Sequence, residues 1–344
     1  MRNDTHNVPT SYFRQFRENH TSVFTFFQGH RESYLPPRIR FVILANPTMD
    51  TVPRIFIESV CLRLLDRKSL EKSTKLPSAW GQICTETCKK IHTLRMLLDS
   101  EKEKIYAAAQ PALSEYRSVS LGSVDLKFIT NFRIETRSRS ATSDLVNHWK
   151  EITLNDLQRL VHFIRPVRNE RHPFQYDYNS FNILSVTHES DWISGKLLSM
   201  RLPVDMVTLS YVNGFFESEG FLYFFRYHGP TLQQSAVDAL IEKFVPIDYG
   251  RFNLHHSISD EQVTKLFEKC VISNKKVTVS AAVSGKSLDF MDLAAKHYSK
   301  KKIGEEGKVL AFFNGAEATL GLVVHLHEEW IQFQWVNANW MRTC

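Results

Sequence analysis

Residues 237–245, VDALIEKFV, are matched by residues 263–271, VTKLFEKCV, which carry Val, Leu, Glu, Lys and Val at the same positions 26 residues later. The apolar residues of each copy have helical spacing, and a short extended piece follows each one, RFNLH at 251–255 and KVTVS at 276–280. A helix and a strand that recur at this interval indicate stacked β-α units, because one unit buries its apolar face only against its neighbours. The stretch predicts an α/β domain of irregular, leucine-rich-repeat-like units.

Further extended pieces continue this pattern in both directions. They contain Ile183, Val207, Phe252, Val277 and Val309, and the interval from 207 to 252 is long enough for two units. A weaker helical pattern, LDFMDLAAKHY, precedes the piece at 309. Near the end of the chain, apolar residues alternate over 320–326 and again over 331–335, which predicts a β-hairpin that covers the last unit. We therefore expect a β-α repeat-like, target-binding domain over residues 151–344.

Two helix starts carry a clear capping signal. Thr153 is followed three residues later by Asp156, and Ser259 is followed three residues later by Gln262. A side-chain oxygen at the first position accepts a free N–H of the first helical turn, and the later side chain returns the bond. Helices are predicted to begin just after Thr153 and Ser259.

Composition restricts the class of protein. The 344 residues include 43% apolar and 23% charged residues, which is typical of a folded domain, and no apolar run approaches the length needed to cross a bilayer. The net charge of +6 is mild, which argues against a dedicated nucleic-acid binder. The five cysteines form an odd set without paired spacings, which indicates free thiols in a reducing compartment, cytoplasmic or nuclear.

The N-terminal third has a different character. Residues 1–48 are rich in arginine and lack clean periodicity, so we expect a poorly ordered extension. Residues 49–98 contain helical patterns, MDTVPRIFIESVCLRLLDRKSLEKSTKLPSAW followed by apolar positions through Ile91, Leu94 and Leu98, which predict three short helices around a small core. Residues 99–150 are expected to form a connector with strand pieces.

The order Val52-Pro53, Val60, Leu64, Leu70, Leu76 and Trp80 resembles an F-box, and the start at Met49 resembles divergent, nematode-type expanded F-box-like proteins. This resemblance implies a substrate-recognition subunit of an SCF-type ubiquitin ligase, which binds the adaptor subunit and through it a cullin. It also implies which residues lie near the adaptor, namely Val52, Pro53, Ile57, Val60 and Leu64, with Trp80 as a structural anchor of the helices. The C-terminal domain would present a target protein that the sequence does not identify.

No catalytic residue, cofactor or metal is expected. A candidate metal site is the cluster His325, His327, Glu328 and Glu329. The alternation of apolar residues over 320–326 instead favours a solvated end of the hairpin at this cluster. No nucleophile elbow, phosphate-binding loop or dinucleotide fingerprint is present in the sequence.

Two alternatives remain open. The chain could be a repeat-type protein–protein interaction module without a link to ubiquitination, whose N-terminal helices only cap the repeat. A nucleic-acid-associating protein, suggested by YFRQFR near the N-terminus, is disfavoured. An exposed apolar patch within residues 52–65 would favour adaptor binding, and complete burial against the repeats would favour the cap.

Overall fold

The computed structural model describes residues 17–18, 21–22, 52–64, 66–114, 117–137, 148–164, 172–210, 220–283, 290–303, 309–314, 319–327 and 330–338. The chain divides into two compact units, Met1–Val52 and Pro53–Cys344. In the first unit the structure describes one antiparallel pair, β1 (Arg17–Glu18) and β2 (Thr21–Ser22). The rest of the expected extension, residues 1–48, lies outside the described residues.

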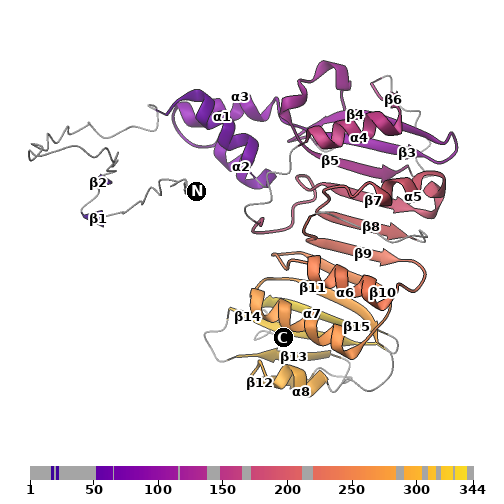
Figure 1. The fold of residues 1–344 in the computed structure, drawn as a ribbon. Helices are drawn as coiled ribbons and strands as arrows, with labels where there is room; N and C mark the ends of the chain where they lie inside the picture. Colours follow the sequence, from indigo (N-terminus) through magenta and orange to yellow (C-terminus); the bar gives the residue numbers. More distant parts are fainter. Residues whose placement is uncertain are drawn as a thin grey trace, which may run out of the picture. The chain divides into compact units, whose positions relative to one another are not determined.

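The second unit is built on one thirteen-stranded sheet (Figure 1), with the strand order β12-β13-β14-β15-β11-β10-β9-β8-β7-β5-β3-β4-β6. Its parallel strands follow one another in chain order: β3 (His92–Asp99), β5 (Ile129–Thr136), β7 (Ile183–Thr187), β8 (Met206–Ser210), β9 (Phe224–His228), β10 (Arg251–Ile258) and β11 (Thr278–Val283). Antiparallel strands flank them: β4 (Lys104–Pro111) and β6 (Lys150–Ile152) at one end, and β15 (Trp330–Asn337), β14 (Leu320–Leu326), β13 (Val309–Phe313) and β12 (Lys300–Ile303) at the other.

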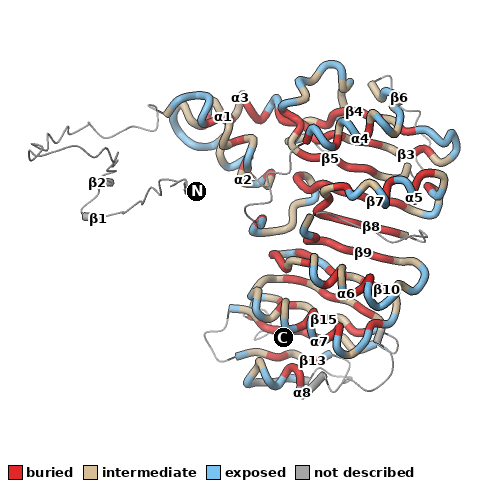
Figure 2. Tube along the Cα trace, in the orientation of Figure 1, coloured by how far each residue is buried: buried red, intermediate tan, exposed pale blue. Residues whose placement is uncertain are grey.

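The helices that follow the strands lie across one face of this sheet. They are α4 (Leu154–Phe163), α5 (Asp191–Ser199), α6 (Gln234–Lys243), α7 (Asp260–Ser273) and α8 (Phe290–Ala295). Their apolar sides share a continuous core with alternate strand residues, such as Leu240 and Phe267 with Phe225 and Phe252. Figure 2 shows that burial runs along the strands from one end of the sheet to the other. Sheet and helices stabilise each other because neither buries its apolar side alone.

The expected elements of this half are largely observed. Both predicted capping boxes are present, Thr153 with Asp156 at α4 and Ser259 with Gln262 at α7. Strand β9 lies between the strands that contain Val207 and Phe252, in the interval that was long enough for two units. The predicted hairpin is β14 and β15, which pair along their lengths. The mixed α/β class is therefore confirmed.

Residues 92–111 correct the expectation of a helix that ends at Leu98, whereas strands are observed after it, where strand pieces were expected. Strands β3 and β4 form an antiparallel hairpin inside the main sheet. Leu94, Met96 and Leu98 are all buried, so the buried side chains recur every two residues, as they do in a strand. The four-residue spacing of Leu94 and Leu98 alone fits a strand as well as a helix. The charged run after Leu98 is the hairpin turn, where the Asp99 carboxylate accepts the backbone N–H groups of Glu101 and Lys102.

Residues 124–129 correct a second expectation. They lie in the connector that was expected to contain strand pieces, but Leu126–Phe128 is a 3-10 turn whose start is capped by the Asp125 side chain. Strand β5 begins only at Ile129. Asp125 explains the difference, because its carboxylate accepts the Lys127 backbone N–H at 3.1 Å and stabilises a turn.

The sheet face opposite α4–α8 carries mostly polar side chains, and we call it the polar face. Its register brings Glu135, Ser185, Thr208, Arg226, Asn253, Ser280 and Gln332 into one row across seven strands. A smaller apolar cluster covers part of this face, where Tyr176 packs against Phe181 and Phe224. No helix in the described ranges is long and apolar enough to span a membrane.

Candidate partner-binding surface

Three short helices precede the sheet: α1 (Arg54–Arg63), α2 (Arg67–Thr74) and α3 (Ala79–Cys88). Their interior is small, and its described members are Ile57 and Cys61 of α1, Leu70 of α2, and Cys84 and Cys88 of α3. The Cys61 and Cys84 sulfurs lie 3.2 Å apart as free thiols. Burial raises the pKa of the Cys88 thiol to about 11, so this interior holds neutral thiols.

The outer side of α1 is apolar and exposed. Ile55 is 77% exposed and Phe56 is 54% exposed, although both are large hydrophobic residues. The helical period places them opposite the buried Ile57 and Cys61, which pack inward one turn apart. An apolar pair at the start of a helix, directed away from the core, is a contact surface that a protein partner could cover.

Charged side chains border this pair. Arg54 donates to Glu58 of α1 at 3.0 Å and to Glu86 of α3 at 2.6 Å. The arginine is 53% exposed in its side chain, so the two ion pairs link the helices at the surface and contribute little stability. An apolar centre with a charged rim is the usual composition of a protein–protein interface.

The five residues expected near the adaptor do not form one surface. Ile57 is fully buried, with its side chain in the interior of the three helices. Pro53 is exposed at the N-cap of α1, and Val52, Val60 and Leu64 are half-buried. Sequence reasoning took the apolar side of the helix as the contact side. The opposite side, with Ile55 and Phe56, is the one that is exposed.

Trp80, expected to anchor the helices, is half-buried in the first turn of α3. The close packing at this point depends on the next residue, Gly81. A β-carbon at Gly81 would lie 1.9 Å from the Leu76 backbone oxygen, so only glycine lets the α2–α3 turn approach the helix. Ser78 within the turn has a φ of 98°, and its side chain accepts the Trp80 backbone N–H.

A buried arginine joins the helices to the sheet. Arg67, at the start of α2, is only 7% exposed. Its guanidinium donates to Asn131 Oδ1 of β5 at 2.8 Å and to Thr93 Oγ1 of β3 at 3.2 Å, and its backbone N–H donates to Asp177 at 2.6 Å. The three helices are thus tied to the polar face at β3 and β5, while the outer side of α1 stays exposed.

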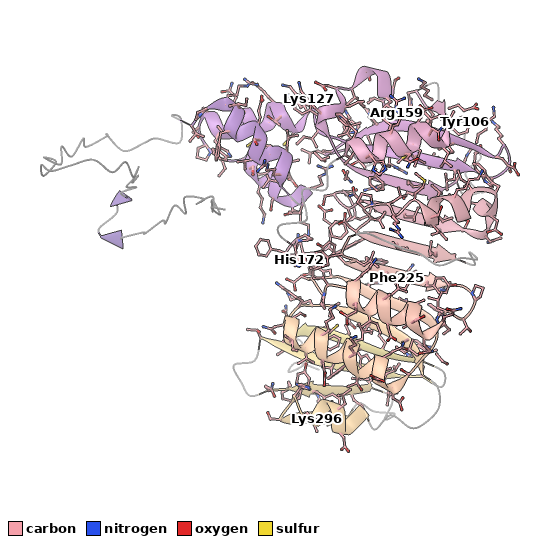
Figure 3. The ribbon with its side chains drawn as sticks, viewed as in Figure 1. Tyr106, Lys127, Arg159, His172, Phe225 and Lys296 are labelled. Carbon is pink, nitrogen blue, oxygen red and sulfur yellow. The ribbon has the colours of Figure 1, made fainter. Side chains whose placement is uncertain are left out.

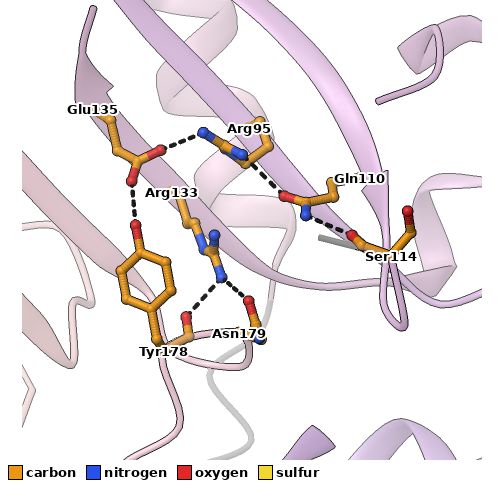
Figure 4. Close-up of polar contacts among 7 residues, drawn as sticks. All are labelled: Arg95, Gln110, Ser114, Arg133, Glu135, Tyr178 and Asn179. Carbon is orange, nitrogen blue, oxygen red and sulfur yellow. Dashed lines mark hydrogen bonds and ion pairs between the residues drawn. The ribbon is translucent and has the colours of Figure 1, made fainter. Parts of the chain in front are cut away.

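The polar side chains beside this contact are hydrogen-bonded to one another (Figure 4). Arg95 donates to Glu135 at 2.6 Å, and Glu135 accepts the Tyr178 hydroxyl at 2.7 Å. Arg133 donates to the Tyr178 carbonyl and to the Asn179 side chain, and its guanidinium stacks 4.1 Å from the centroid of the Tyr178 ring. Segment 174–182 therefore closes the polar face over β5.

Among the described residues no group of three or more His, Cys, Asp or Glu side chains is arranged to hold a metal ion. His327, one of the residues considered for a metal, stacks instead on Trp330 with ring centroids 3.6 Å apart. Glu328 and Glu329 lie outside the described residues.

No protein-family model matches the chain, and no curated protein or solved structure is significantly similar to it. The functional conclusion therefore depends on the residues and their geometry.

Proposed function

We propose that this chain is the substrate-recognition subunit of an SCF-type ubiquitin ligase. The three helices bind the adaptor subunit, and through it a cullin, and the β-α repeat-like domain binds the target protein. The chain acts by binding and supplies no catalytic residue. The single observation that carries the proposal is the exposure of Ile55 and Phe56 on the first helix of a three-helix unit with F-box-like spacing.

The exposure of this apolar pair requires a physical reason. Two large apolar side chains that stay in water at the start of a short helix do not stabilise the fold. We therefore assign them to a surface that a partner covers. The adjoining Arg54, Glu58 and Glu86 would lie at the rim, where they orient the partner more than they add affinity.

The test is a pull-down of the full chain with the purified adaptor subunit. Ile55→Asp and Phe56→Asp together should weaken binding about 100-fold, because placing charges in an apolar contact costs about 3 kcal/mol. Ile272→Asp is the matched control, since Ile272 is also a helix residue and is 82% exposed, on α7. No binding by the folded wild type, or equal binding by the double variant, would overturn the proposal.

The Arg67 contact between the helices and the sheet supports an alternative function. If the three helices only cap the sheet at β3 and β5, the chain is a repeat-type interaction module without a link to ubiquitination. In that case the adaptor does not bind, and target binding through the sheet domain is retained. The exposed outer side of α1 favours the ligase function over this alternative.

A further inference from the structure

The polar face is not uniform along the sheet. Over β5–β9, segment 174–182 covers part of it, with Tyr178 on Arg133 and Glu135 and with Tyr176 on Met206 and Phe224. Over β10, β11 and β15 two hollows are present, of about 330 Å³ and about 420 Å³. They share Arg251 and Thr278, so they form one groove across the three strands, which we call the polar-face groove.

The register shows how this groove is built. Arg251 of β10 lies opposite Thr278 of β11, and Thr278 lies opposite Gln334 of β15. The next row of facing residues, in the direction of Trp330, is Asn253, Ser280 and Gln332. For the side chains of Asn253, Ser280, Gln332 and Gln334 the described part of the chain provides no hydrogen-bond partner. A row of unpaired amides and hydroxyls on adjacent strands offers donors and acceptors to an outside chain.

The charge of the groove has one sign. Arg251 lines both hollows and Lys276 lines one, and no Asp or Glu is among the described residues that line them. Asp248, the residue before Tyr249, accepts the Lys276 backbone N–H at 2.9 Å and is not among the residues that line either hollow. No ion pair of the described residues neutralises Arg251, in contrast to Arg95 on β3, which is paired with Glu135.

Arg226 extends the positive charge onto β9. Its Nε atom is buried without a hydrogen-bond partner among the described residues. Beside it the rings of His228 and His255 stack with centroids 3.6 Å apart. Burial lowers the pKa of both histidines, and the positive charge of Arg226 lowers it further. No ion pair of the described residues involves Arg226, so its positive charge lowers the pKa of these two histidines without being offset by an acid.

Aromatic side chains stand at the two ends of the groove. Trp330 is 37% exposed and lines the first hollow; Tyr249 is 56% exposed and lines the second. Tyr249 has a φ of 66°, a left-handed conformation that is costly for a tyrosine, and its ring lies near the Lys276 ammonium. Exposed aromatic rings next to arginine are the residues that most often dominate binding at an interface.

We infer that the polar-face groove binds an extended, acidic segment of a protein, with one carboxylate held by Arg251 in the groove, a second held by Arg226 beside the groove on β9, and an apolar side chain placed on Trp330. The inference rests on the proposed function, in which this domain receives the target, and it names the chemical class of that target. An acidic protein segment is chosen over a nucleic acid because the cations are few and amides line the groove between them.

Strand spacing sets the pattern that the segment must have. Arg226 and Arg251 are diagonal neighbours on adjacent strands, about 7 Å apart at the backbone, which matches two side chains two residues apart in an extended chain. Trp330 lies two strands beyond β10, about 10 Å across the sheet, and four residues along from Gln334, which is level with Arg251 through Thr278; it is therefore about 16 Å from Arg251, or about five extended residues. The expected motif is acid, any residue, acid, with an apolar residue about five positions from the acid on Arg251.

The test is a selection of random twelve-residue peptides on the full-length protein. We expect at least a tenfold enrichment of Asp or Glu at two positions two residues apart, and loss of this enrichment on the Arg226→Gln, Arg251→Gln double variant. Arg159→Gln is the matched control, because Arg159 lies on α4, on the helix-covered side of the sheet (Figure 3). A selection without acidic enrichment, or with equal enrichment on the double variant, would overturn the inference.

Fluorescence anisotropy of the selected peptide gives the second readout. Replacing both acidic residues of the peptide by amides should weaken binding about tenfold, and so should replacing Arg251 of the protein by Gln. Carboxylates alone should support binding, so the peptide should not require phosphoserine at these positions. Tighter binding of a twelve-residue oligodeoxythymidine, lost in the same double variant, would assign the groove to nucleic acid and overturn the inference. Adaptor binding should be unchanged in the double variant, so failure of the ligase proposal and failure of this inference are separable.

Discussion

The contact between α2 and the sheet can be tested through Arg67→Met, which keeps the length of the side chain and removes its charge. Arg67 is 7% exposed, and its guanidinium donates to Asn131 at 2.8 Å, to Thr93 at 3.2 Å and to Asn179 at 3.3 Å. Hydrogen bonds from a charged group contribute about 1.5–3 kcal/mol each when short, and only the bond to Asn131 is short. The expected loss of unfolding free energy is about 3 kcal/mol.

Urea denaturation followed by circular dichroism measures this loss. With a slope of about 3 kcal/mol per molar urea, the midpoint should fall by about 1 M. Lys68→Met is the control, because Lys68 is the next residue of α2 and is exposed; its unfolding free energy should stay within about 0.5 kcal/mol of the wild type, which is a midpoint shift of at most about 0.2 M. Hydrogen exchange should accelerate in Arg67–Thr74 more than in β8 and β9. Equal midpoints for the two variants would refute the claim that Arg67 holds the helices on the sheet.

Two further predictions concern the same helices. Gly81→Ala should lower the melting temperature by several degrees in a thermal scan, because its β-carbon would lie 1.9 Å from the Leu76 backbone oxygen; an unchanged melting temperature would contradict the close packing of the turn. Burial raises the pKa of Cys88 to about 11 from 9.0, so the unfolded chain releases this proton first and the unfolding free energy should fall as pH rises from about 9 to about 11. Cys88→Ala should reduce that slope, and an identical slope would show that the thiol is not involved.

Local signals in the sequence identified much of the sheet domain. The capping boxes at Thr153 and Ser259 are complete within four residues, so the start of each helix is readable from the chain. The stretch at 263–271 lies within α7, and the stretch at 237–245 lies within α6 up to the end of that helix at Lys243, because a helical period of 3.6 is readable from the chain. The final hairpin was readable because its alternation has a period of two.

Other features could not be read because they depend on contacts between distant residues. Strand β4, KIYAAAQP, contains three alanines and a proline, a composition with low strand propensity, and it is a strand because β3 and β6 pair with it. Arg67 stands in the polar run DRKSLEK and reads as a solvated residue. Its partner Asn131 is 64 residues away in the chain, so nothing local indicated its burial.

The residues predicted to contact the adaptor on α1 differ from those that are most exposed on this helix. The spacing of Ile57, Val60 and Leu64 marked the apolar stripe correctly, but such a stripe packs inward, and Ile57 is fully buried. The available signal was the pair Ile55 and Phe56, which interrupts the polar side of the same helix. The polar-face groove had no signal in the sequence, because its residues come from three strands separated by loops and helices.

The most direct test of adaptor binding by α1 is hydrogen exchange of the full chain with and without the purified adaptor subunit. The adaptor should slow exchange in Arg54–Arg63 and leave exchange in β10 and β11 unchanged. The Ile55→Asp, Phe56→Asp variant should lose this protection. Protection confined to the sheet, or no protection at an adaptor concentration that saturates known F-box proteins, would contradict the assignment of α1 as the adaptor-binding surface.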